Sequence, residues 1–275
     1  MKIGSIKNIS FKTTHLEKAE RNPSVNSQYS KLNHATQFFR YDNNDEFIIS
    51  ILKNKNPNVP LNIISAGCSF GEEVYSFAMA LEDLKHKPNI IGIDVSEDVI
   101  KEANIGSYML DSEERSLFED NFKCRIVRPK TPYREELKRR FYKNFELINP
   151  KFHEYKKKDN SFQNCSFLCA NLNNISSLFE ENSQDIILCR MVLYHMTYSE
   201  RNDFFAQAYK ILKPGGMLCI EPFGHYDYHQ EIMSAGFEHP YNNALFIYTK
   251  PEKDINYFEH IKKLIVHNKS NFNHI

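Results

Sequence analysis

The segment from Ser65 to Ser76, SAGCSFGEEVYS, constrains the fold of this chain more than any other. Residues 61–66 (LNIISA), which overlap the start of this segment, form a short apolar run that predicts a buried strand. Apolar residues recur at helical spacing over residues 72–84, which predicts a helix. A strand, a glycine turn and a helix in this order are typical of a parallel α/β sheet.

Strand-like and helix-like runs continue to alternate after this unit. Further strands are predicted at 89–94, 165–172, 184–196, where the strand runs into a loop, 217–223 and 244–250, and further helices at 96–108, 199–212 and about 227–235. The sequence Lys-Pro-Gly-Gly at 213–216 ends the helix before it. We therefore predict an α/β fold, with a Rossmann-like parallel sheet and flanking helices.

The chain is predicted to have two parts. Residues 1–30 are polar and predict a lightly packed arm, and a helical pattern follows from Ser30 to about Lys55. We take residues 1–55 as this arm with a short helical segment, and residues 56–275 as the main domain. Within the main domain, an insertion at about 109–164 is charged and irregular.

Composition excludes several classes of protein. The 35 Lys and Arg residues balance 35 Asp and Glu residues, so overall charge attracts the chain neither to nucleic acid nor to a membrane surface. No apolar run approaches the roughly 18 residues that a membrane helix needs, and the N-terminus lacks the apolar core of a secretory signal. We expect a cytoplasmic protein without membrane insertion or general nucleic-acid binding.

The six cysteines predict no metal site. They form no C-x-x-C pair, and no histidine cluster completes a zinc pattern with them. We interpret them as reduced, buried side chains of a cytosolic protein.

The turn GCSFG at 67–71 has two interpretations. As G-x-S-x-G, it matches the nucleophile elbow of an α/β-hydrolase, with Ser69 as nucleophile. As a nucleotide turn, Gly67 and Gly71 allow a ligand to approach the backbone at a helix N-terminus. Asp94 favours the second interpretation, because a carboxylate at the end of the second strand can accept both ribose hydroxyls of a nucleoside.

Six segments resemble, in order, the CheR-type chemotaxis receptor methyltransferases, which are protein-glutamate O-methyltransferases. They are TQFFRYDNNDEF (36–47), SAGCSFGEEVYSFAMAL (65–81), GIDVSEDVIKEANIGSY (92–108), CSFLCANL (165–172), ILCRMVLYHM (187–196) and ILKPGGMLCIEP (211–222). The resemblance implies a class I methyltransferase sheet that binds S-adenosylmethionine.

The resemblance also implies a set of cofactor-binding residues. By position in the motifs these are Thr36, Arg40, Ala66, Gly67, Cys68, Glu72, Glu73, Asp94, Val95, Asn171, Leu172 and Arg190. Thr36 and Arg40 would lie over the methionine end of the cofactor, and Glu73, or else Glu72, would meet its charged end. Asp94 would hold the ribose.

At the other end of the cofactor, Asn171 and Leu172 would flank the adenine, and Arg190 would stand at the active-site end of the fourth strand. Some of these assignments have structural alternatives. Asn171 is also explained as a loop residue, Glu72 and Glu73 as favourable charges at a helix N-terminus, and Arg40 and Arg190 as members of ion pairs.

The chain departs from the family on the side of the methyl acceptor. Met191 replaces an Asn, and His195 stands where the family has a Tyr, with Tyr194 one position early. The candidate catalytic residues are therefore Arg40, Arg190, Tyr194 and His195.

The leading hypothesis is a methyltransferase that O-methylates a carboxylate, in a glutamate side chain of a protein or in a small acid. A carboxylate is ionised at neutral pH and needs no base. A second hypothesis is transfer to another nitrogen or oxygen nucleophile, with His195 as base. A third is a regulatory protein that binds the cofactor without catalysis. A chemoreceptor-like protein is a candidate partner.

Overall fold

In this computed structural model the described residues are 36–39, 42–54, 59–110, 115, 132–221, 227–240 and 246–252. The chain divides into two units, Met1–Asn33 and His34–Ile275, and every described residue lies in the second. Among these residues, no helix is long and apolar enough to cross a membrane. The predicted boundary near residue 55 stays a prediction.

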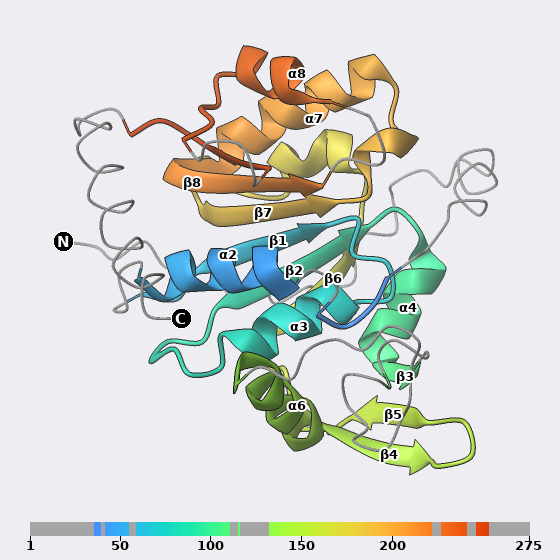
Figure 1. Ribbon diagram of the computed structural model, residues 1–275. Coiled ribbons are helices and arrows are strands. Elements are labelled where there is room, and N and C mark those ends of the chain that lie inside the picture. Colours follow the sequence, from blue (N-terminus) through green and yellow to red (C-terminus); the bar gives the residue numbers. More distant parts are fainter. Residues whose placement is uncertain are drawn as a thin grey trace. The chain divides into compact units, whose positions relative to one another are not determined.

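A six-stranded sheet forms the centre of the described structure, in the order β6-β2-β1-β7-β8-β9 (Figure 1). Its strands are β1 Asn62–Ala66, β2 Asn89–Asp94, β6 Cys165–Cys169, β7 Gln184–Arg190, β8 Leu212–Glu221 and β9 Ile247–Thr249. All neighbours pair in parallel except β8 and β9, which are antiparallel. The chain builds outward from β1 through β2 to β6 and then returns to place β7 on the other side of β1. The predicted Rossmann-like α/β fold is confirmed.

Alternate side chains of the strands enter two separate cores. Ile63 of β1 belongs to one core and its neighbour Ile64 to the other, as the twofold period of a strand requires. The first core packs against α2 (Asp42–Asn54) and α3 (Glu72–Ala80). The second packs against the 3₁₀-helix η2 (Leu172–Ser177), α7 (Tyr198–Ile211) and α8 (His229–Ser234). Figure 1 shows α7 and α8 on one face of the sheet and α2 and α3 on the other.

The insertion is more regular than its sequence suggests. We expected residues 109–164 to be irregular, but they contribute to a second, antiparallel sheet of order β3-β5-β4. Its elements are β3 Ser107–Met109, α6 Pro132–Asn144, β4 Phe145–Asn149 and β5 Glu154–Lys157. Phe145 and Tyr155 are buried in this sheet, whereas the other residues of β4 and β5 are half-buried or exposed, the apolar Leu147 and Ile148 included. A strand with one buried side chain has too weak an apolar pattern to be found from sequence.

Two further differences concern the ends of elements. α4 (Glu97–Ile105) ends earlier than predicted, at Gly106, whose φ of 64° ends the helix in the left-handed region. β8 begins earlier than predicted, directly after α7, and its pairing with β7 shifts between Gln184 and Ile186. The Lys-Pro-Gly-Gly turn is therefore accommodated as an irregularity inside β8.

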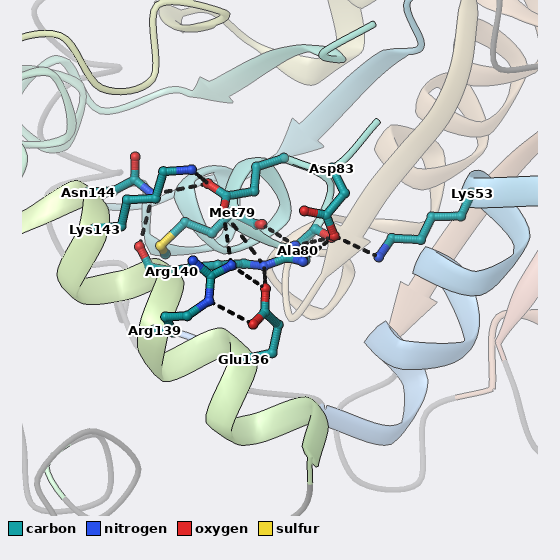
Figure 2. A network of polar contacts seen from close by, with 10 residues as sticks. Lys53, Met79, Ala80, Asp83, Glu136, Arg139, Arg140, Lys143 and Asn144 are labelled. Carbon is teal, nitrogen blue, oxygen red and sulfur yellow. Dashed lines mark hydrogen bonds and ion pairs between the residues drawn. The ribbon is translucent and has the colours of Figure 1, made fainter. Parts of the chain in front are cut away.

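A buried arginine of α6 closes the C-terminal end of α3, in the network that Figure 2 shows. The Arg140 guanidinium donates hydrogen bonds to the carbonyls of Met79 at 2.8 Å and Ala80 at 2.9 Å, and to Glu136 at 2.7 Å, and it pairs with Asp83. Carbonyls in the last turn of a helix lack partners within the helix. Arg140 supplies those partners and thereby fixes α6 against α3.

Replacing Arg140 by Met should lower the free energy of unfolding by about 3 kcal/mol, because the carbonyls of Met79 and Ala80 would lose their donor in a buried place. Urea denaturation measures this change. Arg139→Met is the matched control, since the Arg139 side chain is 60% exposed and pairs with the same Glu136. The control should change stability by less than about 0.5 kcal/mol. Equal effects of the two substitutions would contradict the role of Arg140.

Candidate functional site

The glycine turn lies where the strand order of the sheet reverses, between the carboxyl ends of β1 and β7. The backbone N–H groups of Gly67 and Cys68 both donate to the Ile93 carbonyl of β2, at 2.7 and 3.0 Å. Ligands of open α/β sheets bind at such a reversal point. The turn predicted to bind the cofactor is thus held at the expected edge of the sheet.

Gly67 is required here for two reasons. Its φ is 74°, in the left-handed region that side chains disfavour. A Cβ atom on Gly67 would also lie 2.3 Å from a methyl carbon of Val192, in the loop after β7. The turn after β1 and the loop after β7 are therefore in direct contact at Gly67.

Asp94, the predicted ribose ligand, is buried at the end of β2 and holds the turn. One carboxylate oxygen accepts a hydrogen bond from the Ser69 N–H and the other from the Ser96 N–H, each at 3.0 Å. A carboxylate oxygen can accept two hydrogen bonds, so these contacts leave capacity for ribose hydroxyls. The cofactor role of Asp94 and of the adjacent, half-buried Val95 stays a prediction.

Glu73 and Arg190, predicted separately as cofactor residues, form an ion pair. The Arg190 Nε donates to Glu73 at 2.6 Å, and the Ser65 hydroxyl donates to the other Glu73 oxygen at 2.7 Å. The guanidinium of Arg190 also lies 5.4 Å from the centre of the Phe77 ring. The structural alternative for Arg190 is therefore what the structure shows, and any cofactor contact of either side chain comes in addition to this pair.

The other predicted residues of the turn are buried. Ala66 is the last residue of β1, and Glu72 lies in the first turn of α3, where the helix dipole favours a carboxylate. Burial raises the pKa of the Cys68 thiol, and the nearby carboxylates of Asp94 and Glu73 raise it further. Cys68 therefore stays a neutral thiol at physiological pH and is no nucleophile.

Asn171 and Leu172, the predicted adenine neighbours, begin the 3₁₀-helix η2. The Asn171 side chain caps this helix by accepting a hydrogen bond from the Asn173 N–H at 2.9 Å. Leu172 is buried in the core on the α7 side of the sheet. The Ala170 N–H donates to the Asp94 carbonyl at 2.9 Å, so η2 starts beside the candidate ribose site.

The candidate acceptor side lies in the loop after β7. Tyr194 and His195 belong to the short 3₁₀-helix η3 (Leu193–His195), and their ring centres are 3.8 Å apart. Tyr194 is half-buried and His195 exposed. Met191, just before this helix, has a φ of 58°, where the family's Asn would be favoured over Met.

A hollow borders the same strand ends. It is lined by Ile48, Arg190, Cys219, Ile220, Glu221, Phe246 and Ile247. Arg190 and Glu221 are register partners at the carboxyl ends of β7 and β8, so the hollow contains one cation and one carboxylate.

The segment that contains Thr36 is tied to α3, because the Phe39 N–H donates to the Ser76 hydroxyl at 3.0 Å. Thr36 itself is half-buried. Arg40 lies outside the described residues, so its predicted role stays a prediction.

The sequence did not indicate the residues that pack against the turn. The Ser65 hydroxyl bonds to Glu73, and Val192 contacts Gly67. A Cβ atom on Gly71 or on Gly92 would lie 2.8 or 2.7 Å from a carbon of the Phe167 ring. A serine inside the apolar run of β1 was a usable signal for a buried polar contact. Phe167 and Val192 gave no such signal, because apolar residues in strands and loops are common.

The hydrolase interpretation of Ser69 is not supported. Its hydroxyl is buried and has no hydrogen-bond partner among the described residues, whereas a nucleophilic serine needs an exposed hydroxyl and an adjacent base. Its φ of 49° is strained for a serine.

Backbone strain is present in each of three predicted cofactor and acceptor segments. Phe39, Ser69 and Met191 have φ values of 50°, 49° and 58°. Such strain of non-glycine residues costs of order 1–3 kcal/mol each. It is not confined to these segments, because His153, Phe162 and Asn182 also have positive φ values.

Met191→Asn should raise the free energy of unfolding by about 1 kcal/mol, because Asn tolerates the left-handed conformation better than Met. Thermal or urea unfolding measures the gain. Met196→Asn, in the same loop at a φ of −97°, should give no gain. A loss of stability in the Met191 variant would show that packing of its side chain outweighs the strain.

Cys169 tests where the adenine would lie. Of the described cysteines, all free, it is the exposed one, and its thiol donates to the Val95 carbonyl at 3.5 Å. Partial burial and then the carboxylates of Glu97 and Asp94 raise the pKa of Cys169. The rate of its alkylation should therefore keep rising with pH until the pH exceeds the usual pKa of a thiol.

S-adenosylhomocysteine should slow the alkylation of Cys169 at least severalfold, as measured by peptide mass spectrometry. An unchanged rate at saturating ligand would contradict our placement of the adenine.

Comparisons with known proteins bear on the whole arrangement. Residues 34–140 match the model of the CheR methyltransferase, SAM binding domain, and residues 135–220 match a methyltransferase domain. These matches confirm the predicted cofactor, S-adenosylmethionine, and the predicted class of domain.

Several curated relatives are chemotaxis methyltransferases of bacteria. The chemotaxis protein methyltransferase Cher2 of Pseudomonas putida is 26% identical over 64% of this chain and 62% of its own length. A chemotaxis protein methyltransferase of Campylobacter jejuni is 29% identical over 58% of this chain and 53% of its own length. This chain thus spans between half and two thirds of the length of these two relatives.

The chemotaxis protein methyltransferase of Borreliella burgdorferi matches over a longer stretch. It is 30% identical over 246 residues, which cover 80% of this chain and 75% of the relative. The order of motifs predicted from the sequence, the sheet topology and these matches agree, and the chain belongs to the CheR family of methyltransferases.

Proposed function

We propose that this protein transfers the methyl group of S-adenosylmethionine to a carboxylate, in a glutamate side chain of a protein. The observation that carries the proposal is that the backbone N–H groups of residues 67–69 form hydrogen bonds to the end of β2, where the strand order of a CheR-family sheet reverses. S-adenosylmethionine supplies an electrophilic methyl group on a sulfonium.

The residues present fit this cofactor. Asp94 keeps acceptor capacity for the ribose beyond its two backbone contacts. The Ser69 hydroxyl is buried without a hydrogen-bond partner among the described residues, as expected of a group that a polar ligand completes. Asn171 and Leu172 would flank the adenine from the start of η2.

A carboxylate acceptor agrees with the chemistry of the described residues. Methyl transfer is an in-line displacement in which the enzyme mainly aligns the two reactants. A carboxylate attacks in its ionised form and requires no proton transfer. Arg190 borders the hollow at the strand ends, and a guanidinium there would orient an incoming carboxylate.

The partner that we propose is a chemoreceptor-like protein, and the names of the matched relatives, chemotaxis protein methyltransferases, support this proposal. A small acid is an alternative acceptor for the same chemistry, because its carboxylate is ionised in the same way. The expected cytoplasmic location stays a prediction.

A second candidate is transfer to a neutral nitrogen or oxygen nucleophile. The position of His195 favours it, because its ring is exposed at the end of η3 and lies against Tyr194. An imidazole there could accept the proton that such a nucleophile must lose.

Asp94→Asn should weaken the binding of S-adenosylhomocysteine by about 1–3 kcal/mol, the scale of a lost hydrogen bond to a charged group. Isothermal titration calorimetry measures the affinity, and a melting curve shows whether the turn stays folded. Asp98→Asn is the matched control, since its side chain is 93% exposed on α4. The placement of the ribose is wrong if both variants bind as the unchanged protein does.

The nature of the acceptor follows from the stability of the methylated product. With radiolabelled S-adenosylmethionine and receptor fragments, a methyl ester would release volatile methanol in mild alkali, whereas a methylated amine would not. We expect release, and we expect His195→Phe to retain turnover. Alkali-stable label together with an inactive His195→Phe protein would instead establish the second candidate.

A further inference from the structure

Arg201, in the first turns of α7, joins three elements next to the candidate acceptor side. Its guanidinium donates to both carboxylate oxygens of Glu231 on α8, at 2.7 and 2.9 Å. A third donor of the same group reaches the carbonyl of Met196 at 2.9 Å. Met196 directly follows His195, so this contact fixes the end of η3.

Two aromatic rings enclose the same guanidinium. The carbon at its centre lies 5.1 Å from the centre of the Tyr228 ring and 5.9 Å from that of Tyr198. The side chains of Arg201 and Glu231 are 16% and 13% exposed. The planar fork of an arginine suits this combination of a bidentate carboxylate and nearby aromatic rings.

The loop is therefore fixed at both ends. Thr197 caps α7 in a capping box with Glu200, which sets where the loop enters the helix. Gly67 meets Val192 at the start of the loop, in the contact described above. Between these points lies η3 with Tyr194 and His195, which is held by the buried Leu193 and by the bond from Arg201 to the Met196 carbonyl.

Stability alone does not explain this arrangement. The desolvation of a largely buried ion pair offsets much of its Coulomb attraction, so such a pair contributes little net stability relative to apolar side chains. What the pair does provide is a donor held at one place, 2.9 Å from the Met196 carbonyl.

We propose that Arg201 is a positioning residue for the acceptor side: held by Glu231, it fixes the Met196 carbonyl and thereby the placement of η3, with Tyr194, at the candidate acceptor side. This inference rests on the proposed methyl transfer. It requires no contact of Arg201 with the cofactor or the acceptor.

The test compares three variants of the full chain: Arg201→Lys, Glu231→Gln, and the double variant that exchanges the two residues, Arg201→Glu with Glu231→Arg. The exchange restores an ion pair between α7 and α8 but removes the donor from position 201. Lys210→Gln is the control, because Lys210 lies on the same helix in an exposed pair with Glu181 at 3.2 Å. The readouts are the affinity for S-adenosylhomocysteine, kcat and KM, the melting temperature, and amide hydrogen exchange over residues 193–197.

In Arg201→Lys, we expect kcat to fall roughly a hundredfold, the scale of a misplacement of about 1 Å, while the affinity for S-adenosylhomocysteine changes less than about twofold. Glu231→Gln should lower kcat less. The exchange of Arg201 and Glu231 should recover the melting temperature but not kcat. Hydrogen exchange of the amides of residues 193–197 should accelerate in all three variants and not in the control.

Recovery of kcat together with the melting temperature in the exchange would overturn the inference, because a merely structural ion pair would behave so. Unchanged kcat in Arg201→Lys would also overturn it. If the unchanged protein methylates no acceptor, the proposed function fails, and hydrogen exchange then decides alone: an unchanged rate over residues 193–197 in Arg201→Lys refutes the positioning role.

Discussion

The candidate site depends on three successive N–H groups that bond to the end of β2. Gly67 and Cys68 donate to the Ile93 carbonyl, and Ser69 donates to the Asp94 carboxylate. These bonds bring the turn after β1 to the end of the neighbouring strand β2. Because Asp94 is both the anchor of this turn and the candidate ribose ligand, the geometry of the turn and of the ligand site cannot vary independently.

The second sheet supports this turn. The Tyr108 hydroxyl of β3 donates to the Phe70 carbonyl at 2.7 Å, and the Tyr75 hydroxyl of α3 donates to the Ala103 carbonyl of α4 at the same distance. The ring of Phe38 meets those of Tyr108 and Phe145 edge-to-face. The insertion is therefore part of the framework of the site, since its aromatic side chains share one core with α3.

Buried cations complete the ends of helices on both faces of the sheet. Arg140 bonds the last carbonyls of α3, and the Lys250 ammonium bonds the carbonyls of Tyr209 and Leu212 at the end of α7, at 2.8 and 2.9 Å. Both cations come from segments distant in sequence. Each cation thus bonds to carbonyls at the end of a helix, which lack partners within that helix, and it fixes that helix to the rest of the fold.

The pairing of Glu73 with Arg190 changes how the site meets its cofactor. Taken singly, each charge attracts one end of a zwitterionic methionine group. Paired at 2.6 Å, the two charges largely cancel at long range, so recognition of the cofactor by the predicted site would rely on short contacts of the turn. The same pair ties α3 to β7, so a change at either residue affects both the cofactor side and the acceptor side.

The sequence by itself determined the order of strands and helices around the turn, the family and the residues at the strand ends. Local periodicity encodes these features, and the glycines of GCSFG permit a backbone that few other residues adopt. It did not determine the second sheet, the pairing of Glu73 with Arg190, the capping role of Arg140 or the contact of Arg201 with Met196. Only the tertiary structure decided these, because each depends on side chains brought together across elements, where local patterns carry no information on which charge meets which.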